Sequence, residues 1–289
     1  MTGLLVIGET GQLAGELARL PAAARMRFAG RRSFDLGVDD PAPLLYAHRP
    51  SAVINAAVYS GVDKAESEPD LCYAVNRDGP ARLAAACAAR DIPLVHVSTD
   101  YVFDGAKGAP YVESDAVNPL NVYGRSKAEG EAAVVAAGGR HAILRTTWVF
   151  GSQGATFILM MLKLARERDE ARMVADQLGR PTWSHELAGL CVRVADRLAD
   201  GDEGAQGVFH AAGFEDATRA DMADVIFAEL ARRGLKTPTV TRVGMAEYFT
   251  PAVRPIDSRL DSSLARDQLD WRPRPWRETV PEVTAGLLA

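Results

Sequence analysis

Short apolar runs alternate with longer amphipathic stretches along the first half of the chain. The apolar runs predict buried strands, and stretches whose apolar residues recur every three to four positions predict helices. Strands are expected at residues 3–8, 26–30, 52–57, 93–98 and 142–145, and helices after Gly8 and within 42–48, 63–90 and 122–137. Because helices separate the strands, the pattern predicts an α/β fold of the Rossmann type, with a doubly wound parallel sheet and right-handed crossovers.

The pattern becomes less regular after residue 150, where helices are expected with few strands. The expected elements are helices at 157–168, 184–198, 220–233, 262–269 and 279–288, a short strand at 208–211 and a proline-rich segment at 238–258. We therefore expect a dinucleotide-binding Rossmann domain over residues 1–150, on which residues 172–203 pack back. Residues 151–171 and 204–289 are expected to form a smaller, C-terminal substrate-binding region.

The first predicted strand ends in a glycine turn, Gly8-Glu9-Thr10-Gly11-Gln12-Leu13-Ala14. Gly8 allows the tight turn, Gly11 lets the backbone approach a pyrophosphate, and Ala14 holds the position where the helix packs on the strand. With a strand before it and a helix after it, the turn predicts a dinucleotide site. The expected contacts are Gly8, Thr10, Gly11, Gln12 and Leu13. A purely structural turn is the alternative, since glycine is common in turns.

The residues after the second predicted strand distinguish the two nicotinamide dinucleotides. A carboxylate at this place binds the ribose 2′-hydroxyl of NAD, whereas this chain has Arg31 and Arg32. Their planar guanidinium donors suit a 2′-phosphate, so NADPH is the expected cofactor and NADH the alternative. Asp35 and Leu36 are assigned to the same site. The other interpretation is that both arginines are solvated surface residues.

Tyr123 and Lys127 lie four residues apart in a predicted helix, which places both side chains on one face. A ketone that gains a hydride becomes an alkoxide and needs a proton, but a phenol with a pKa of about 10 is a weak acid at neutral pH. A neighbouring ammonium favours the phenolate and lowers that pKa. Ser98 and Thr99 end the fourth strand, where open α/β sheets bind ligands. Thr99 is therefore expected to hydrogen-bond a carbonyl oxygen beside Tyr123.

Further runs of the chain belong with these motifs. The whole set is Gly8–Leu13, Asn55–Ala57, Val62–Glu68, Ser98–Phe103, Pro119–Lys127, Arg145–Phe150, Asp176–Thr182 and Thr250–Leu260. With this set the chain resembles the extended short-chain dehydrogenases and, within them, the dTDP-4-dehydrorhamnose reductase family. It departs from the family pattern at Ala14, at Ser60-Gly61 and at Asp257.

The resemblance implies reduction of the 4-keto group of a dTDP-6-deoxyhexose to give dTDP-L-rhamnose, with hydride from NAD(P)H. It implies that Tyr123 is the acid, Lys127 its partner and Thr99 the donor to the carbonyl. The implied cofactor contacts also include Asn55, Ala56, Ala57, Tyr59 and Ser98. The implied substrate contacts are Ser60, Val62, Thr99, Asp100, Tyr101 and Trp148, with Arg254 and Arg259 as bidentate donors to the nucleotide diphosphate.

Structural roles are the alternatives for some of these residues. Trp148 follows a strand and is suited to a core, Asn55 to capping a strand end, and Arg254 to a solvated loop. The carboxylates of residues 63–68 are interpreted as charges that favour a helix start rather than as metal ligands. No metal site is expected.

Three other functions compete with the leading one. The nearest is a 4-ketoreductase for another nucleotide deoxysugar, such as dTDP-dihydrostreptose. The second is a dinucleotide-binding regulatory subunit without catalysis, which the presence of Tyr123 and Lys127 opposes. The third is an epimerase that retains NAD, which Arg31 and Arg32 oppose.

Composition narrows the class of protein further. The net charge of −5 gives no basic footprint for nucleic acid. Cys72, Cys87 and Cys191 lack metal-ligand spacing and are expected to be buried thiols in a reducing cytoplasm. The apolar run at residues 3–8 is too short for a signal peptide or a membrane span. We therefore expect a soluble cytoplasmic enzyme whose partner is a small nucleotide sugar, with a homodimer left open.

Overall fold

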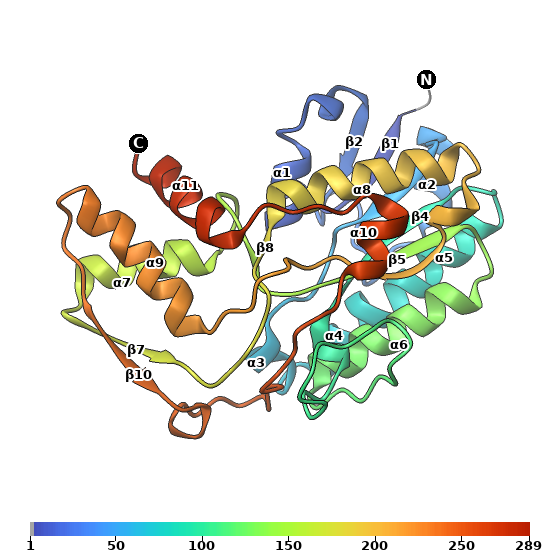
Figure 1. Ribbon diagram of the computed structural model, residues 1–289. Helices are drawn as coiled ribbons and strands as arrows, with labels where there is room; N and C mark the ends of the chain where they lie inside the picture. The colour runs from blue at the N-terminus through green and yellow to red at the C-terminus, as the bar shows by residue number, and fades with distance from the viewer. Residues whose placement is uncertain (1–2) are drawn as a thin grey trace.

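A six-stranded parallel sheet forms the centre of the protein, whose computed structural model describes residues 3–289 (Figure 1). Its strands are β1 (Leu4–Ile7), β2 (Met26–Ala29), β3 (Ala52–Asn55), β4 (Leu94–Thr99), β5 (His141–Thr146) and β9 (Gly207–His210). They lie in the order β2-β1-β3-β4-β5-β9. The Rossmann-type α/β fold expected from the sequence is confirmed.

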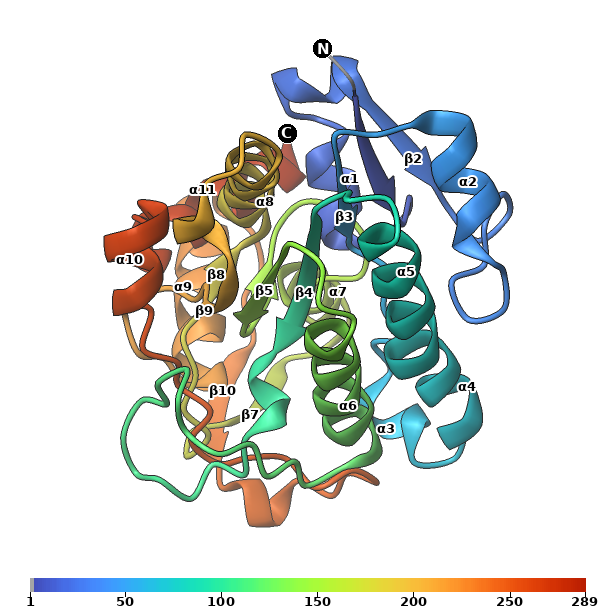
Figure 2. The same cartoon turned by 90° about the vertical axis from the view of Figure 1, so that its right-hand side faces the viewer.

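Helices cover both faces of this sheet. Leu4 and Val6 belong to one hydrophobic cluster, and Leu5 and Ile7 to another, as the two-residue period of a strand requires. The first face is covered by α1 (Gln12–Leu17) and α8 (Ser184–Ala199), and the second by α2 (Pro41–His48), α5 (Gly79–Ala88) and α6 (Val122–Ala136) (Figure 2). The buried thiols of Cys87 and Cys191 lie in these clusters, as expected.

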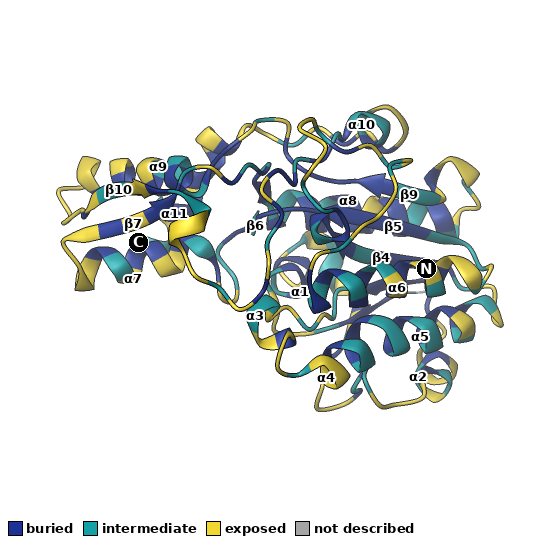
Figure 3. Ribbon diagram, turned by 90° about the horizontal axis from the view of Figure 1, so that it is seen from below, coloured by how far each residue is buried: buried dark blue, intermediate teal, exposed yellow. Residues whose placement is uncertain are grey.

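A third hydrophobic cluster lies beside the sheet, and the elements that form it are what we call the cap (Figures 1 and 3). Its elements are α7 (Phe157–Glu167), β7 (Glu170–Val174), α9 (Arg219–Arg232), β10 (Thr239–Val243) and α11 (Trp276–Leu288). Thr156 accepts a hydrogen bond from the backbone at the start of α7, and Thr218 and Asp221 form a capping box at the start of α9. These caps fix where both helices begin.

The remaining elements are short and lie between those of the sheet and the cap along the chain. They are the strand pair β6 (Val149–Phe150) and β8 (Thr182–Trp183), the helices α3 (Val62–Ala65), α4 (Pro69–Tyr73) and α10 (Ser263–Leu269), a π-helical stretch at Ala74–Asp78, and 3₁₀ turns at Pro21–Arg25, Asp100–Val102, Glu203–Ala205 and Met245–Glu247. The helix-rich stretch 63–90 is interrupted before α4, where Pro69 stands in the first turn and its missing N–H is tolerated, whereas α4, the π-helical stretch and α5 follow one another without a break.

The division between sheet and cap differs from the expected residue boundaries. β9 is a strand of the main sheet and α10 packs in its cluster, although residues 204–289 were assigned wholly to the substrate-binding region. β7 pairs with β10 in the cap, although it extends into residues 172–203. Strand partners far away in the sequence decide these assignments, and local periodicity does not show them.

The strand order places a ligand crevice at one edge of the sheet. The chain passes from β1 to β2 on one side and then to β3 on the other side of β1. Crevices at such switch points lie beyond the carboxyl ends of the strands and are where doubly wound sheets bind ligands. No helix within residues 3–289 is long and apolar enough to cross a membrane.

Candidate active site

A cleft of about 1830 Å³ lies between the carboxyl edge of the sheet and the cap. Binding pockets for single small ligands usually measure about 300–1,000 Å³, so this cleft has room for more than one. Residues of the glycine turn line it together with Tyr123, Lys127 and Arg254. The structure therefore brings the three separate motifs of the sequence into one space.

The glycine turn after β1 has the geometry that a close ligand requires. Gly8 has φ of 116°, which side chains rarely tolerate, and its N–H donates to Ala29 O at 2.8 Å. A Cβ on Gly11 would have no heavy atom within 4 Å, so this side of the turn is open. Across the cleft, the Gln12 amide donates to Ala155 O at 2.9 Å. Thr10, Gln12 and Leu13 line the cleft with both glycines.

The residues after β2 form the mouth of the cleft. Arg31, Arg32, Asp35 and Leu36 all line it, and both arginines are exposed. Arg31 Nε lies 3.8 Å from Asp35 Oδ2, which is a loose ion pair. Glu9 is exposed beside Gly30, where a Cβ would come within 2.3 Å of its carboxylate. Two guanidinium groups are thus available at this end.

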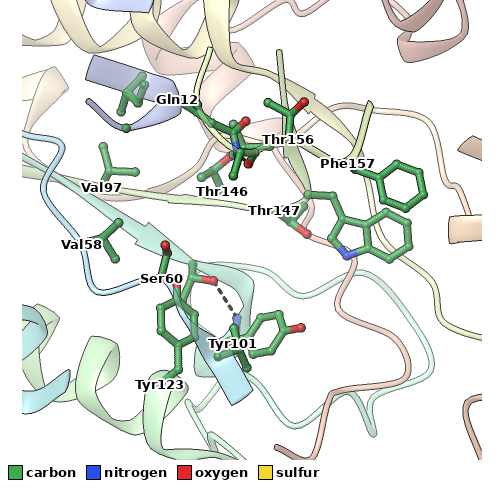
Figure 4. A pocket seen from close by; sticks show the side chains of 18 of the residues that line it. Gln12, Val58, Ser60, Val97, Tyr101, Tyr123, Thr146, Thr147, Thr156 and Phe157 are labelled. Carbon is green, nitrogen blue, oxygen red and sulfur yellow. Dashed lines mark hydrogen bonds between the residues drawn. The ribbon is translucent and has the colours of Figure 1, made fainter. Parts of the chain in front are cut away.

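Tyr123 and Lys127 project from one face of α6 into the inner part of the cleft. The start of α6 is fixed by Asn121, which accepts from Gly124 N at 2.7 Å and donates to Val253 O at 2.7 Å. The ring of Tyr123 meets that of Tyr101 edge to face, with centroids 5.6 Å apart. In Figure 4 both tyrosines lie on one side of the pocket, and Thr156 and Phe157 lie on the other.

The protonation of this pair is governed by burial. Burial raises the pKa of Tyr123, and a hydrogen bond with Thr99 opposes that rise. The sequence predicts that the Lys127 ammonium lowers this pKa, but in the protein without ligands burial is the larger effect. Burial also lowers the pKa of Lys127 to about 8, against an opposing contribution from Glu131. The lysine side chain is 1% exposed, and its Nζ donates to Val97 O at 2.7 Å.

Asp100 positions the residues around Tyr123. Its buried carboxylate accepts from Thr99 Oγ1 at 3.1 Å and from Thr147 Oγ1 at 2.8 Å. Burial raises the pKa of Asp100, and these hydroxyl donors lower it. The family resemblance assigned Asp100 to the sugar. It lines the cleft, but its oxygens are engaged by the two threonines, so it holds Thr99 in place.

Trp148 forms part of the opposite wall in a strained conformation. Its φ of 46° is left-handed, which costs a residue other than glycine about 1–3 kcal/mol. One face of the indole packs on Gly179, where a Cβ would come within 2.3 Å of Cε2. The guanidinium carbon of Arg219 lies 3.7 Å from the ring centroid. Trp148 is thus a buried member of the cap cluster and also a lining residue of the cleft.

The comparisons with known proteins agree over the whole chain. The family model described as RmlD substrate binding domain matches residues 1–288. A dTDP-4-dehydrorhamnose reductase of Sinorhizobium fredii is 40% identical over 99% of this chain and 97% of its own. The chain belongs to the dTDP-4-dehydrorhamnose reductase family. The family expected from the motifs is therefore confirmed.

Solved structures of this family have the same fold. A dTDP-4-dehydrorhamnose reductase of Clostridium acetobutylicum superposes with a TM-score of 0.91 at 32% identity, covering 99% of this chain and 100% of the other. One from Bacillus anthracis, solved in complex with NADP, has a TM-score of 0.88 at 28% identity, with the same coverage of 99% and 100%.

Three residues that the family resemblance assigned to ligands do not line the cleft. The Tyr59 hydroxyl donates to Glu68 at 2.8 Å, away from the cleft, while Ala56 and Ala57 line it. Asn55 is buried at the end of β3 and accepts from Ala57 N at 3.2 Å, the strand-end role that was the alternative. Arg259 is held by Asp257, with Nη2 2.7 Å from Oδ2, and by Asp216. Hydrogen-bond or ion-pair partners within the protein therefore hold all three side chains.

Other lining residues were not predicted as ligand contacts. Arg219 begins α9, and its guanidinium lies over both Trp148 and Phe157. Asp63, interpreted as a helix-start charge, binds Arg254 through two contacts of 2.9 and 2.8 Å. Among residues 3–289 no group of three or more His, Cys, Asp or Glu side chains is arranged to hold a metal ion. Ser60, Val62 and Arg254 lie in the cleft as expected.

Proposed function

We propose that the protein reduces the 4-keto group of a dTDP-6-deoxyhexose with NADPH, converting dTDP-4-dehydro-L-rhamnose into dTDP-L-rhamnose. The observation that carries the proposal is the meeting of Tyr123, Lys127 and Thr99 with the glycine turn in one cleft. Family membership supports a reductase, since the relatives at 36–40% identity carry that name. The size of the cleft supports a dinucleotide and a nucleotide sugar bound side by side.

The residues present fit a nicotinamide dinucleotide. Gly8 and the open side of Gly11 admit a pyrophosphate to the backbone, and Arg31 and Arg32 stand where a ribose 2′-phosphate would lie. The NADP complex of the Bacillus anthracis relative supports the phosphorylated form. NADH is the alternative cofactor. When bound, the dinucleotide would supply the hydride.

Tyr123 is proposed to donate the proton to the sugar oxygen. Its raised pKa keeps the phenol protonated, as an acid must be before it acts. Thr99 Oγ1 donates to Asp100 in the protein without ligands, and its single hydroxyl proton would turn from that carboxylate to the same carbonyl oxygen when the sugar binds. Lys127 is one helical turn from Tyr123, and its positive charge would stabilise the phenolate left after proton transfer.

The cap supplies cations for the nucleotide diphosphate. Arg254 lines the cleft and is oriented by Asp63, with Nη2 2.8 Å from Oδ2. No hydrogen bond or ion pair engages the Arg219 guanidinium within residues 3–289, although it is enclosed by aromatic rings. Guanidinium groups bind phosphate through paired hydrogen bonds. We assign both arginines to the diphosphate, and this replaces Arg259 in that role.

A 4-ketoreductase for another nucleotide deoxysugar is the second candidate. Ser60 lines the cleft at a position where the chain departs from the family pattern, so the sugar subsite differs locally. An assay of NADPH oxidation with a panel of dTDP-4-ketosugars separates the two. Turnover of dTDP-4-dehydro-L-rhamnose well above that of its relatives supports the first. No oxidation with that sugar, but oxidation with another, excludes it.

The regulatory and epimerase alternatives are tested in the same assay. A regulatory subunit would oxidise no NADPH with any ketosugar, and an epimerase would retain its dinucleotide through dialysis. A homodimer and a cytoplasmic location remain predictions of the sequence.

A further inference from the structure

His96 lies in the middle of β4, directly behind the proposed catalytic lysine, and no step of the proposed reaction uses it. It is 0% exposed. Its Nδ1 lies 3.1 Å from Asn55 Nδ2 on β3, and its Nε2 lies 3.3 Å from Lys127 Nζ on α6. A buried imidazole between an amide and an ammonium must place its proton on one of the two nitrogens.

A fixed backbone donor determines which nitrogen carries that proton. Ala57 N–H lies 3.2 Å from the Asn55 side chain, so the oxygen of that amide must face Ala57 and the NH₂ group must face His96. His96 Nδ1 then accepts a hydrogen bond and carries no proton. Burial holds the pKa of His96 well below its usual range, so the ring is neutral and its one proton is on Nε2.

This tautomer presents an N–H donor to Lys127. An ammonium has only donors, whereas a neutral amine has one lone pair that can accept. Lys127 Nζ already donates to Val97 O at 2.7 Å, so an amine at this place satisfies both neighbours and an ammonium satisfies one.

A second buried histidine shows the opposite arrangement in the same sheet. His210 Nδ1 lies 3.0 Å from Tyr111 O, a backbone acceptor, so its proton is on Nδ1. Its Nε2 is then an acceptor, 3.4 Å from the Arg145 guanidinium. His210 therefore presents an acceptor nitrogen to Arg145, whereas His96 presents an N–H donor to Lys127.

The other groups around Lys127 do not remove this conflict. Glu131, one turn further along α6, favours the ammonium, but its carboxylate is bound by Arg145 at 2.7 Å and by Ser98. The thiol of Cys72 on α4 favours the ammonium only when it is ionised, and burial raises its pKa. Tyr123 on the same helix is protonated for the same reason.

We propose that His96 is a positioning residue for Lys127: with its proton fixed on Nε2 by Asn55, it donates a hydrogen bond to Nζ and shifts the lysine from the ammonium toward the neutral amine. Burial lowers the pKa of Lys127 to about 8, and a hydrogen bond from His96 would act in the same direction. The catalytic meaning of Lys127 rests on the proposed function, but the hydrogen-bond chain does not.

The tautomer is measured directly in the protein without ligands. Selective ¹⁵N-histidine labelling and a two-bond ¹H–¹⁵N correlation spectrum near pH 7 distinguish the two tautomers, and the signal missing in His96→Phe assigns His96. We expect an Nε2–H tautomer for His96 and an Nδ1–H tautomer for His210. An Nδ1–H tautomer or an imidazolium at His96 overturns the proposal, whether or not the protein reduces a ketosugar.

A variant pair tests the effect on Lys127. In Asn55→Asp a carboxylate still accepts from Ala57 N–H but now also accepts from His96, which moves the ring proton to Nδ1 and makes Nε2 an acceptor. We expect the alkaline limb of the kcat/KM–pH profile to move upward by about one unit. The double variant Asn55→Asp/His96→Phe carries the same carboxylate without the ring and should move less. An equal shift in both variants overturns the proposal, as does no shift in Asn55→Asp once its spectrum shows the Nδ1–H tautomer.

Discussion

The two walls of the cleft differ in how their polar groups are engaged. On the sheet wall, Lys127, Thr99 and Asp100 are each bound by neighbours of the same wall. On the cap wall, Arg219 has no hydrogen-bond partner and the buried Nε1 of Trp148 has none either, among the residues that the structure describes. The sheet wall is therefore preorganised for chemistry, and on the cap wall the Arg219 guanidinium, which lines the cleft, is left for a ligand to use.

This comparison predicts that changes to the sheet wall lower kcat and that changes to the cap wall raise KM. Tyr123→Phe should have the largest effect, a fall in kcat of about 10²–10⁴-fold, because it removes the proton donor. Dinucleotide binding, measured by fluorescence titration, should remain. Full activity in this variant would show that Tyr123 is not the proton donor and that the sheet wall does not carry the chemical step.

Lys127→Met should show how much the buried positive charge lowers the free energy of unfolding. The folded pKa of about 8 lies below the ordinary value of about 10.4. Because protonating this lysine is harder in the folded state, the folded state loses stability as the pH falls from about 10.4. The loss is complete once the pH is below about 8. The change in unfolding free energy on substitution should thus be more favourable at pH 7 than at pH 10.5, by up to about 3 kcal/mol. Denaturant unfolding at both values measures it, and equal changes would contradict it.

Arg219→Met should weaken substrate binding without affecting the chemical step. Hydrogen bonds to charged groups contribute about 1.5–3 kcal/mol, which corresponds to roughly 10–100-fold in KM for the nucleotide sugar. Arg266→Met is the matched control, since Arg266 pairs with Asp267 on the surface of α10. A fall in kcat at unchanged KM would show that the walls are not divided in this way.

Arg31→Ala/Arg32→Ala should have the smallest effect, confined to the cofactor. Both arginines are exposed, so their hydrogen bonds to a 2′-phosphate compete with water. We expect KM for NADPH to rise about tenfold, while KM for NADH stays unchanged because NADH lacks that phosphate. Equal changes for both cofactors would indicate general damage at the mouth of the cleft.

The sheet wall was more predictable from the sequence than the cap wall. The glycine turn and the spacing of Tyr123 and Lys127 are local features, and a strand or helix places them directly. Arg219 reaches Trp148 only because α9 and the segment after β5 fold together, so no local pattern indicated it. Tyr59 and Arg259 were placed wrongly relative to the cleft because Glu68 and Asp257 bind their side chains. Both partners are near in the sequence, but the folded backbone decides which neighbouring carboxylate each side chain reaches, and residue spacing alone does not show it.

The most direct measurement of the central claim follows the hydride into the sugar. The protein is incubated with dTDP-4-dehydro-L-rhamnose and NADPH that carries deuterium on the transferable position of the nicotinamide, and the product is analysed by mass spectrometry and NMR. The account predicts dTDP-L-rhamnose with one deuterium on C4, formed in equal amount to the NADPH oxidised. Unlabelled product, or NADPH that remains unoxidised with this sugar, would contradict it.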